Sequence, residues 1–297
     1  MIEKLKGDWE KYKGNPILSL SQNSWDSVFV RDAFIIKKRR QYYMFYTGRM
    51  TNGSAIGLAI SEDGFKFKKT NCPAVKTTKN WEANSALFGS VIKHKNEFIL
   101  YYNGGNENLL GIGATTSIDL IHWRKHKNNP IWCTKTNVSC TKQLLPFVIF
   151  YKDKYFMYTE SLKAGWGIDV SISCDPYRFV DFNTVWTGAK DLNLDKCGAA
   201  NPKVFIVDGM LLMGYNGFDY ENPGNLRFAV SEDGINWKPF NDGKLILQKK
   251  NGEWDGFRTE NAFLLFDNDI KLYYFGSQHK ATNYRWDIGV ATLKDKI

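Results

Sequence analysis

Tyrosine-rich apolar runs recur along the chain at a regular spacing of roughly 40 to 60 residues, the range typical of four-stranded repeat units. The clearest run is segment 41–48 (QYYMFYTG), and its counterparts are 97–104 (EFILYYNG), 154–161 (KYFMYTES), 210–217 (MLLMGYNG) and 270–277 (IKLYYFGS). Aromatic and β-branched residues favour strands. Each run therefore predicts one strand, and the five copies predict an internally repeated fold.

A second marker, Ser-x-Asp-x-x-x-aromatic, follows four of these runs and begins at Ser61, Ser117, Ser173 and Ser231. An aspartate in such a turn can accept backbone N–H bonds, and a following glycine supplies a positive φ. Each repeat then consists of four strands. A short apolar strand comes first, the tyrosine-rich strand second, a strand such as Ile56–Ile60 third, and the segment after the turn fourth.

Repeated four-stranded units are typical of a β-propeller. We therefore expect an all-β, single-domain chain, 1–297, with five blades at 25–75, 81–133, 140–190, 196–248 and 254–297. The fifth copy stops after its third strand. Segment 9–17 (WEKYKGNPI) matches 123–131 (WRKHKNNPI), the fourth strand of blade two. The N-terminal segment is thus predicted to complete blade five and close the ring, which removes exposed sheet edges.

Composition narrows the class of protein further. Hydrophobic residues are 43% of the chain and charged residues 24%, which allows a packed core. No apolar run approaches the ~20 residues of a membrane-spanning helix. The net charge of +9 is spread between acidic residues, without a nucleic-acid reader motif. Five cysteines without metal-ligand spacing, and an N-terminus without an apolar signal segment, lead us to expect a cytoplasmic protein with free thiols and no metal or cofactor.

One repeat position singles out a candidate site. Nine residues before each tyrosine-rich run stand Asp32, Phe88, Leu145, Asn201 and Asn261, so only the first copy is an acid. The innermost strands of a propeller converge on its axis, and residues at their starts line one mouth of the central channel. The polar candidates at this mouth are Arg31, Asp32, Asn84, Gln143, Asn201, Lys203, Arg258, Glu260 and Asn261.

Asp32 is the first candidate for chemistry, because Arg31 beside it favours the ionised form that a general base needs. Glu260 is the candidate acid partner for work on a glycosidic bond. It stands one register step from Asp32, so strand alternation leaves open whether the two face the same side. The alternative for Asp32 is an ion pair that ties blades together, and for Glu260 the two interpretations weigh equally.

Other polar residues carry weaker signals. Glu160 ends a tyrosine-rich strand, and we interpret it as part of a surface loop, with approach to the channel as the alternative. His279 is interpreted as a solvated histidine. Asp26, Glu82 and Asp255 each follow a tryptophan, and this recurrence indicates a structural turn. The stretch from Asp181 to Asp195 is interpreted as an irregular exposed connection.

The Arg-Asp-Ala motif at 31–33, the YYMFYTG strand and the IGLAxSxDG segment resemble the five-bladed β-propeller glycoside hydrolases of families 43, 32 and 130. The resemblance covers essentially the whole chain. It implies that Asp32 matches the blade-one catalytic base. The second-blade aspartate of that group would fall near Leu87 or Phe88, and the third-blade glutamate, the general acid, near Leu144 or Leu145; neither is present.

These observations favour a carbohydrate-active enzyme of the glycosidase type, with Asp32 as base, Glu260 as candidate acid, and the remaining channel residues as substrate ligands. The basic residues also suit an anionic sugar, a sugar phosphate or inorganic phosphate, which makes a phosphorylase or transferase a variant of this hypothesis. The alternative is a non-catalytic sugar-binding or scaffolding propeller that has lost hydrolase activity. A third interpretation is a propeller that binds other proteins.

Overall fold

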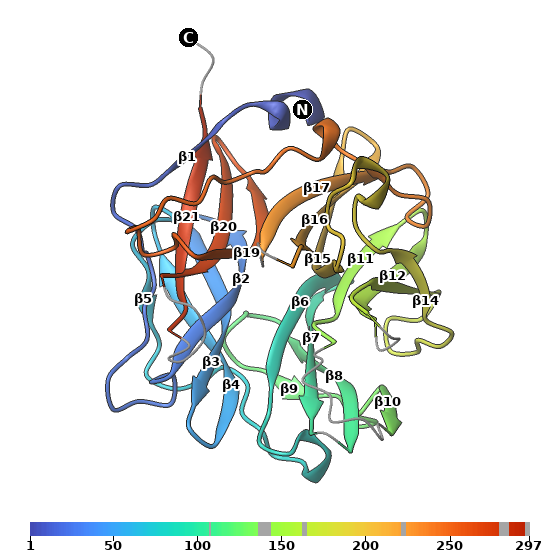
Figure 1. Ribbon diagram of the computed structural model, residues 1–297. Helices are drawn as coiled ribbons and strands as arrows, with labels where there is room; N and C mark the ends of the chain where they lie inside the picture. The colour runs from blue at the N-terminus through green and yellow to red at the C-terminus, as the bar shows by residue number, and fades with distance from the viewer. Residues whose placement is uncertain (107, 136–143, 162–164, 221–223, 279–284, 295–297) are drawn as a thin grey trace.

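The computed structural model describes residues 1–106, 108–135, 144–161, 165–220, 224–278 and 285–294. Its strands form five antiparallel sheets around a common centre, which confirms the predicted five-bladed β-propeller (Figure 1). Short 3-10 helices occur at η1 (Ile2–Lys6), η2 (Asn80–Glu82), η3 (Lys190–Leu192) and η4 (Asn241–Gly243). No helix within these ranges is long and apolar enough to span a membrane.

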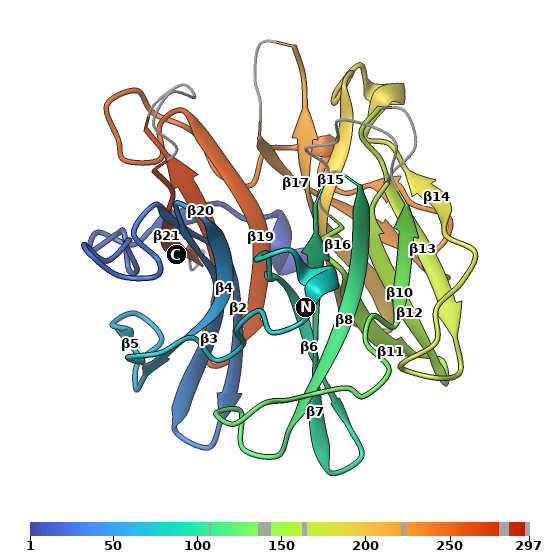
Figure 2. The same ribbon diagram turned by 90° about the horizontal axis from the view of Figure 1, so that it is seen from below.

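Each blade starts with its innermost strand and runs outward, so that in blade one the short β5 lies farthest from β2 (Figure 2). Blade one contains β2 (Phe29–Lys38), β3 (Gln41–Met50), β4 (Gly53–Ser61) and β5 (Lys68–Lys69). Blade two contains β6 (Leu87–His94), β7 (Glu97–Gly105), β8 (Leu109–Ser117), β9 (Arg124–Lys125) and β10 (Trp132–Lys135). Because β9 and β10 both pair with β8, blade two has one strand more than the sequence predicts.

The remaining blades have four strands each. Blade three contains β11 (Phe147–Tyr151), β12 (Lys154–Glu160), β13 (Ile168–Ser173) and β14 (Asn183–Trp186). Blade four contains β15 (Gly198–Val207), β16 (Met210–Phe218), β17 (Asn225–Ser231) and β18 (Lys238–Pro239). Blade five contains β19 (Arg258–Phe266), β20 (Ile270–Ser277), β21 (Asp287–Leu293) and β1 (Trp9–Lys11). The stretch 181–195 is therefore not wholly irregular, because it includes β14 and η3.

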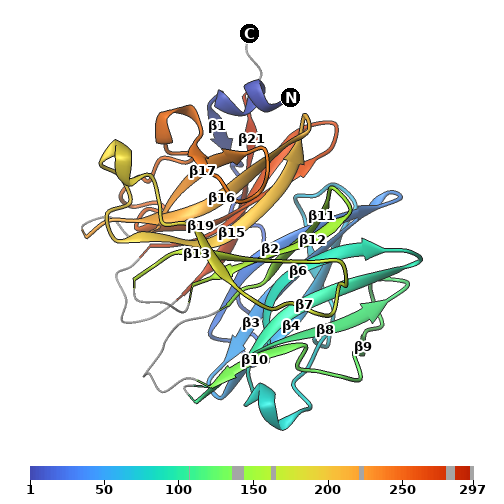
Figure 3. The same ribbon diagram turned by 90° about the vertical axis from the view of Figure 1, so that its right-hand side faces the viewer.

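The N-terminal strand closes the ring, as the sequence predicts. β1 pairs antiparallel with β21, with Trp9 opposite Leu293 and Lys11 opposite Ala291, and the two strands lie side by side (Figure 3). The matching segment of blade two shares this geometry. Asn15 in blade five and Asn129 in blade two each precede a cis proline, and each side-chain amide bonds the backbone of the third strand. Closure leaves blade five with a paired outer strand.

The Ser-x-Asp turns also form as expected. In the turn at Ser231, the Asp233 Oδ1 accepts the backbone N–H groups of Ile235 and Asn236, both at 2.8 Å. These bonds hold the pKa of the Asp233 carboxyl below its ordinary value. The turns at Ser61 and Ser117 repeat the same bonds. The marker is therefore a structural repeat.

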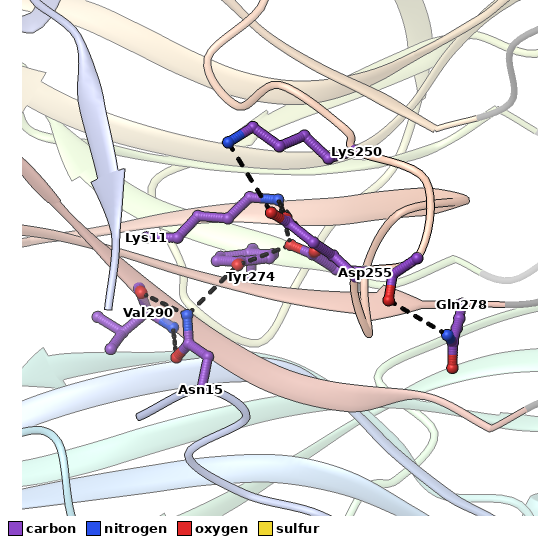
Figure 4. Close-up of polar contacts among 9 residues, drawn as sticks. Lys11, Asn15, Lys250, Asp255, Tyr274, Gln278 and Val290 are labelled. Atoms are coloured by element: carbon purple, nitrogen blue, oxygen red, sulfur yellow. Dashed lines mark hydrogen bonds and ion pairs between the residues drawn. The ribbon is translucent and has the colours of Figure 1, made fainter. Parts of the chain in front are cut away.

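Four blades share an arrangement of a buried acid, a tyrosine of the second strand and a cation, which we call the acid–tyrosine–cation triad. The four triads are Asp26–Tyr46–Lys69, Glu82–Tyr102–Lys125, Asp195–Tyr215–Arg227 and Asp255–Tyr274–Lys11. Figure 4 shows the triad of blade five, where Lys11 from the N-terminal strand reaches the Asp255 carboxylate at 2.9 Å. The structural role expected of Asp26, Glu82 and Asp255 is confirmed.

Phenylalanines of the inner strands meet on the propeller axis. The Phe34 ring lies 5.5 Å from Phe88, 5.9 Å from Phe147 and 4.5 Å from Phe263, measured between ring centroids. Phe205 of blade four packs on Phe147 and Phe263. These rings fill the axis with apolar side chains. The polar strand starts therefore line a mouth with an apolar floor.

Candidate active site

A backbone irregularity at the same place in several inner strands builds the mouth. The ladder shifts register between Arg31 and Phe34 in β2, and the corresponding shifts occur in β15 and β19. The bulged residues Asp32, Asn201 and Asn261 have φ values of 60°, 54° and 69°. Aspartate and asparagine tolerate this left-handed region better than most residues do. Backbone geometry thus gives one reason for the residue types at these positions.

At the repeat position of Asp32, the backbone N–H groups of three other residues donate to a side chain from the preceding blade. Phe88 N donates to Thr47 Oγ1, Leu145 N to Asn103 Oδ1 and Asn261 N to Asn216 Oδ1. Thr47, Asn103 and Asn216 occupy one register position near the end of the second strand. In blade three that position belongs to Glu160. A carboxylate therefore stands where blades one, two and four have a hydroxyl or an amide.

Asp32 is a buried carboxylate that pairs with Arg31. Its side chain is 1% exposed, and its Oδ2 lies 3.1 Å from Arg31 Nε. Neither carboxylate oxygen accepts a hydrogen bond from the described ranges of the chain. Buried polar atoms normally have hydrogen-bond partners. Asp32 thus keeps acceptor capacity that a bound ligand or water could use.

Glu260 occupies in β19 the register position that Arg31 occupies in β2. Its Oε1 lies 2.9 Å from Arg258 Nε, and its Oε2 accepts a bond of 2.9 Å from Asn216 Nδ2. Burial raises the pKa of Glu260, the Arg258 and Arg31 guanidinium groups oppose that shift, and Asp32 adds to it. The charge of Asp32 thus disfavours ionisation of Glu260. The bulge interrupts strict strand alternation, which allows both side chains to face the mouth.

Glu160 belongs to the same cluster, and its interpretation as a surface-loop residue is wrong. It is 7% exposed at the end of β12. Burial raises the pKa of its carboxyl to about 8, with Arg31 opposing the shift and Glu260 adding to it. The carboxyl is therefore mostly protonated at neutral pH. The sequence signal was present, since an acid stands where three of the other repeats have an amide or a hydroxyl.

Lys203 brings a buried cation to the cluster from blade four. It is 1% exposed, its ammonium donates to Asn201 Oδ1 and to the Pro202 carbonyl, and it lies 5.6 Å from the Phe147 ring centroid. Burial lowers the pKa of Lys203 to about 8, and the Asp32 and Glu160 carboxyls oppose that shift. Lys203 thus interacts electrostatically with both Asp32, the candidate base, and Glu160 of blade three.

The other predicted residues differ in where they lie. Arg258 rests over the rings of Trp286 and Phe218 at 5.6 and 5.9 Å while it pairs with Glu260. Asn261 Nδ2 donates to the Ala33 carbonyl of blade one and so joins the two inner strands. Asn84 lies outside the cluster, exposed, with its carbonyl bonded by Ser54 N. Gln143 and His279 lie outside the described residues.

Lys249 is a half-buried basic residue that the sequence did not single out. Its ammonium donates to Asn225 Oδ1 at 3.0 Å. Burial lowers the pKa of Lys249, the Arg258 and Arg227 cations lower it further, and Glu260 opposes them. No cluster of three or more histidine, cysteine, aspartate or glutamate side chains within the described ranges has the geometry of a metal site. The mouth is thus a mixed cluster of carboxylates and cations.

The fold and this axial cluster define a five-bladed propeller with a charged central site. No protein-family model matches the chain, and no curated protein matches it. Solved structures do. One that is described simply as a glycoside hydrolase superposes with a TM-score of 0.75 at 14% identity, over 100% of this chain and 96% of that one.

Two further structures are similar over nearly their whole lengths. A thermostable family-43 glycoside hydrolase gives a TM-score of 0.69 at 15% identity, with 94% of each chain covered. An N-acetylgalactosamine deacetylase from F. plautii, in complex with blood group B trisaccharide, gives 0.69 at 14% identity, over 97% of this chain and 95% of that one. The chain thus has the fold of the five-bladed glycoside hydrolases, and the resemblance seen in the sequence is confirmed at that level.

Proposed function

We propose that this protein is a carbohydrate-active enzyme of the glycosidase type, acting on a glycosyl bond at the axial mouth. The observation that carries the proposal is the buried cluster in which Asp32 pairs with the Arg31 guanidinium while burial raises the pKa of Glu160. Two carboxyl groups in different protonation states are what general acid–base cleavage of a glycosidic bond requires. The shared fold with solved glycoside hydrolases supports the same class.

In the proposed hydrolysis, the oxygen of a water molecule bonds to the anomeric carbon while Asp32 takes a proton from that water. The bond from that carbon to the leaving oxygen breaks, and Glu160 gives its proton to the leaving oxygen. The buried proton on Glu160 suits the acid role. The missing inner-strand glutamate near Leu144 supports this assignment, because Glu160 N bonds the Leu144 carbonyl at 2.9 Å.

Glu260 is reassigned in this proposal from acid to positioning residue. Its carboxylate is already engaged by Arg258 and by the Asn216 amide, so it is less free to deliver a proton. Arg31, Lys203 and Arg258 supply positive charge beside the carboxylates. They suit an anionic sugar or phosphate, which keeps a phosphorylase or transferase as a variant of the same chemistry.

The second candidate is a sugar-binding propeller without catalysis. It is favoured by the second blade, where Leu87 and Phe88 are 4% and 1% exposed and stand where the resemblance implies an aspartate.

A cytoplasmic location is also proposed. It is supported by the free thiols of Cys72, Cys133, Cys174 and Cys197, since disulfides are rare in that compartment.

The test is product release from a panel of oligosaccharides and glycosyl phosphates, with and without inorganic phosphate. Wild type is compared with Asp32→Asn and Glu160→Gln, and with Asp153→Asn and Glu232→Gln as exposed controls. The proposal expects turnover that both site variants abolish and both controls keep. Undiminished turnover in Asp32→Asn would remove the assignment, and saturable binding without turnover in wild type would favour the sugar-binding alternative.

A further inference from the structure

Blade three lacks the tyrosine of the acid–tyrosine–cation triad. In the ladders between second and third strands, Tyr46 lies opposite Gly57 and Tyr102 opposite Gly113. At the same register position of blade three, Thr159 lies opposite Asp169. A Cβ atom at Gly57 would come within 2.2 Å of the Tyr46 ring, so in blade one the ring occupies the space of a side chain at that position. Loss of the ring in blade three makes room for a side chain.

A pocket of about 380 Å³ lies against Thr159 and adjoins the axial cluster through Glu160. Its wall includes Trp132, Thr159, Glu160, Asp169, Asp181 and Phe182. Glu160 belongs to this wall and also to the axial cluster, so the pocket opens beside the group proposed to protonate the leaving oxygen. The pocket therefore lies where a sugar unit next to the cleaved bond would sit.

Asp169 is a buried acid in this pocket whose carboxylate is not neutralised by the described part of the chain. It is 5% exposed, and its Oδ1 is fully buried yet accepts no hydrogen bond from those residues. By contrast, the four triad acids each have a lysine or arginine as well as a tyrosine hydroxyl. A buried carboxylate without a cation is costly. Comparison with the other blades thus shows that Asp169 has no positively charged hydrogen-bond donor among the residues that the structure describes.

The remaining wall of the pocket sets the shape and charge of a ligand. Trp132 and Phe182 meet edge to face, with 5.2 Å between ring centroids, and present the apolar surface that the C–H face of a sugar ring packs against. The titratable side chains on the described wall are all acidic, namely Glu160, Asp169 and the exposed Asp181. A ring that carries a protonated amine satisfies both features.

We propose that this blade-three pocket is a subsite for an amino-sugar unit, with the Asp169 carboxylate bound to its ammonium group and the ring packed on Trp132 and Phe182. The inference rests on the proposed function for the identity of the ligand as a sugar. It goes beyond that function by naming the substrate class and a residue, Asp169, that determines specificity.

Binding is measured directly, by calorimetry and ligand-observed NMR, so that the result does not depend on turnover. The probes are the methyl glycosides of glucosamine and galactosamine, each compared with its N-acetyl and hydroxyl counterparts. The variants are Asp169→Asn and Thr159→Tyr. Tyrosine is compatible with a side chain across the ladder, because Tyr215 lies opposite Arg227 in blade four. Asp153→Asn, in the exposed turn just before β12, is the control.

We expect the amine probes to bind wild type more tightly than their neutral counterparts, and Asp169→Asn to weaken them by about tenfold or more, as befits a charge-assisted bond. Thr159→Tyr should abolish this binding. Its unfolding should remain cooperative, which would show that the variant still folds. Equal affinity for amine and neutral probes, or amine binding that survives Asp169→Asn, would overturn the proposal. If amine binding depends on Asp169 and no glycoside is cleaved, the subsite is supported and the proposed catalysis is contradicted. If glycosides are cleaved and wild type shows no preference for the amine probes, the catalysis is supported and the subsite is contradicted.

Discussion

The backbone N–H of Glu160 donates a 2.9 Å hydrogen bond to the carbonyl of Leu144. Leu144 stands near the inner-strand position where the resemblance to glycoside hydrolases implies an acid. The neighbouring strand β12 thus brings a carboxylate to the cluster from beside the strand that lacks one. A site can keep a carboxyl group while the strand that supplies it changes.

The first prediction concerns the role of Glu160 as proton donor. We expect Glu160→Gln to lower kcat/KM on alkyl glycosides by about 10² to 10⁴, the usual contribution of general acid catalysis. Aryl glycosides with acidic phenols should be much less affected, because their leaving oxygen needs no proton. The measurement is kcat/KM across a series of leaving groups. An equal loss on every substrate would contradict the acid role.

The second prediction is the pH dependence of turnover. Burial raises the pKa of Glu160 to about 8, so the protonated form decreases as the pH rises through that value. Because a general acid must carry its proton, kcat/KM should fall on the alkaline side with a midpoint near 8. The pH–rate profile of wild type checks this. A profile flat from pH 7 to 9 would contradict it.

The same group gives stability a pH dependence of defined sign. The pKa of Glu160 is raised in the folded state, so above the ordinary value of 4.5 the folded chain binds more protons than the unfolded chain. The contribution of Glu160 to stability is complete below about 4.5 and is lost as the pH rises toward about 8. Glu160→Gln should remove this loss. Denaturant unfolding of both proteins at pH 5 and pH 8 measures the difference.

The third prediction separates charge from backbone at Asp32. This residue has φ = 60°, a conformation that costs alanine more than asparagine. Asp32→Asn should therefore fold with near wild-type stability, whereas Asp32→Ala should be about 1 kcal/mol less stable than Asp32→Asn. Urea unfolding of the two variants measures the gap. Equal stabilities would show that the bulge relaxes around alanine.

The fourth prediction concerns the ring closure. Lys11 lies 2.9 Å from Asp255, whose side chain is fully buried. Lys11→Met leaves that carboxylate without its cation and should cost about 3 kcal/mol of unfolding free energy. Lys244→Met, which breaks an exposed ion pair with Asp8, is the matched control and should cost under about 1 kcal/mol. Similar losses in both variants would contradict the prediction.

The sequence predicted the fold almost completely, because each repeat independently indicates the same four-stranded unit. The match between 9–17 and 123–131 located the closing strand, and the same asparagine–proline turn appears in both. The extra strand β10 and the short β14 were missed, since each lies in a stretch without the repeat markers. Short outer strands have few apolar positions, and their sequences therefore carry little periodic signal.

The candidate site was predictable only in part. Asp32, Glu260, Lys203 and Arg258 share one cluster, but a linear pattern does not show that a bulge lets neighbouring residues face the same cavity. Thr159 illustrates the same limit. Its significance lies in a tyrosine that is missing relative to four other blades, and that comparison requires the cross-strand register.

The pairing of β1 with β21 has a consequence for biosynthesis. The ribosome makes β1 before the other strands of the propeller and β21 after them, so blade five combines the first and the last of these strands to be synthesised. Until β21 has been made, β1 lacks the strand with which it pairs. Until Asp255 has been made, Lys11 lacks the carboxylate with which it pairs. A chain that stalls before β21 keeps an open sheet edge of the kind that invites aggregation. The ring can therefore close only after β21 has been synthesised.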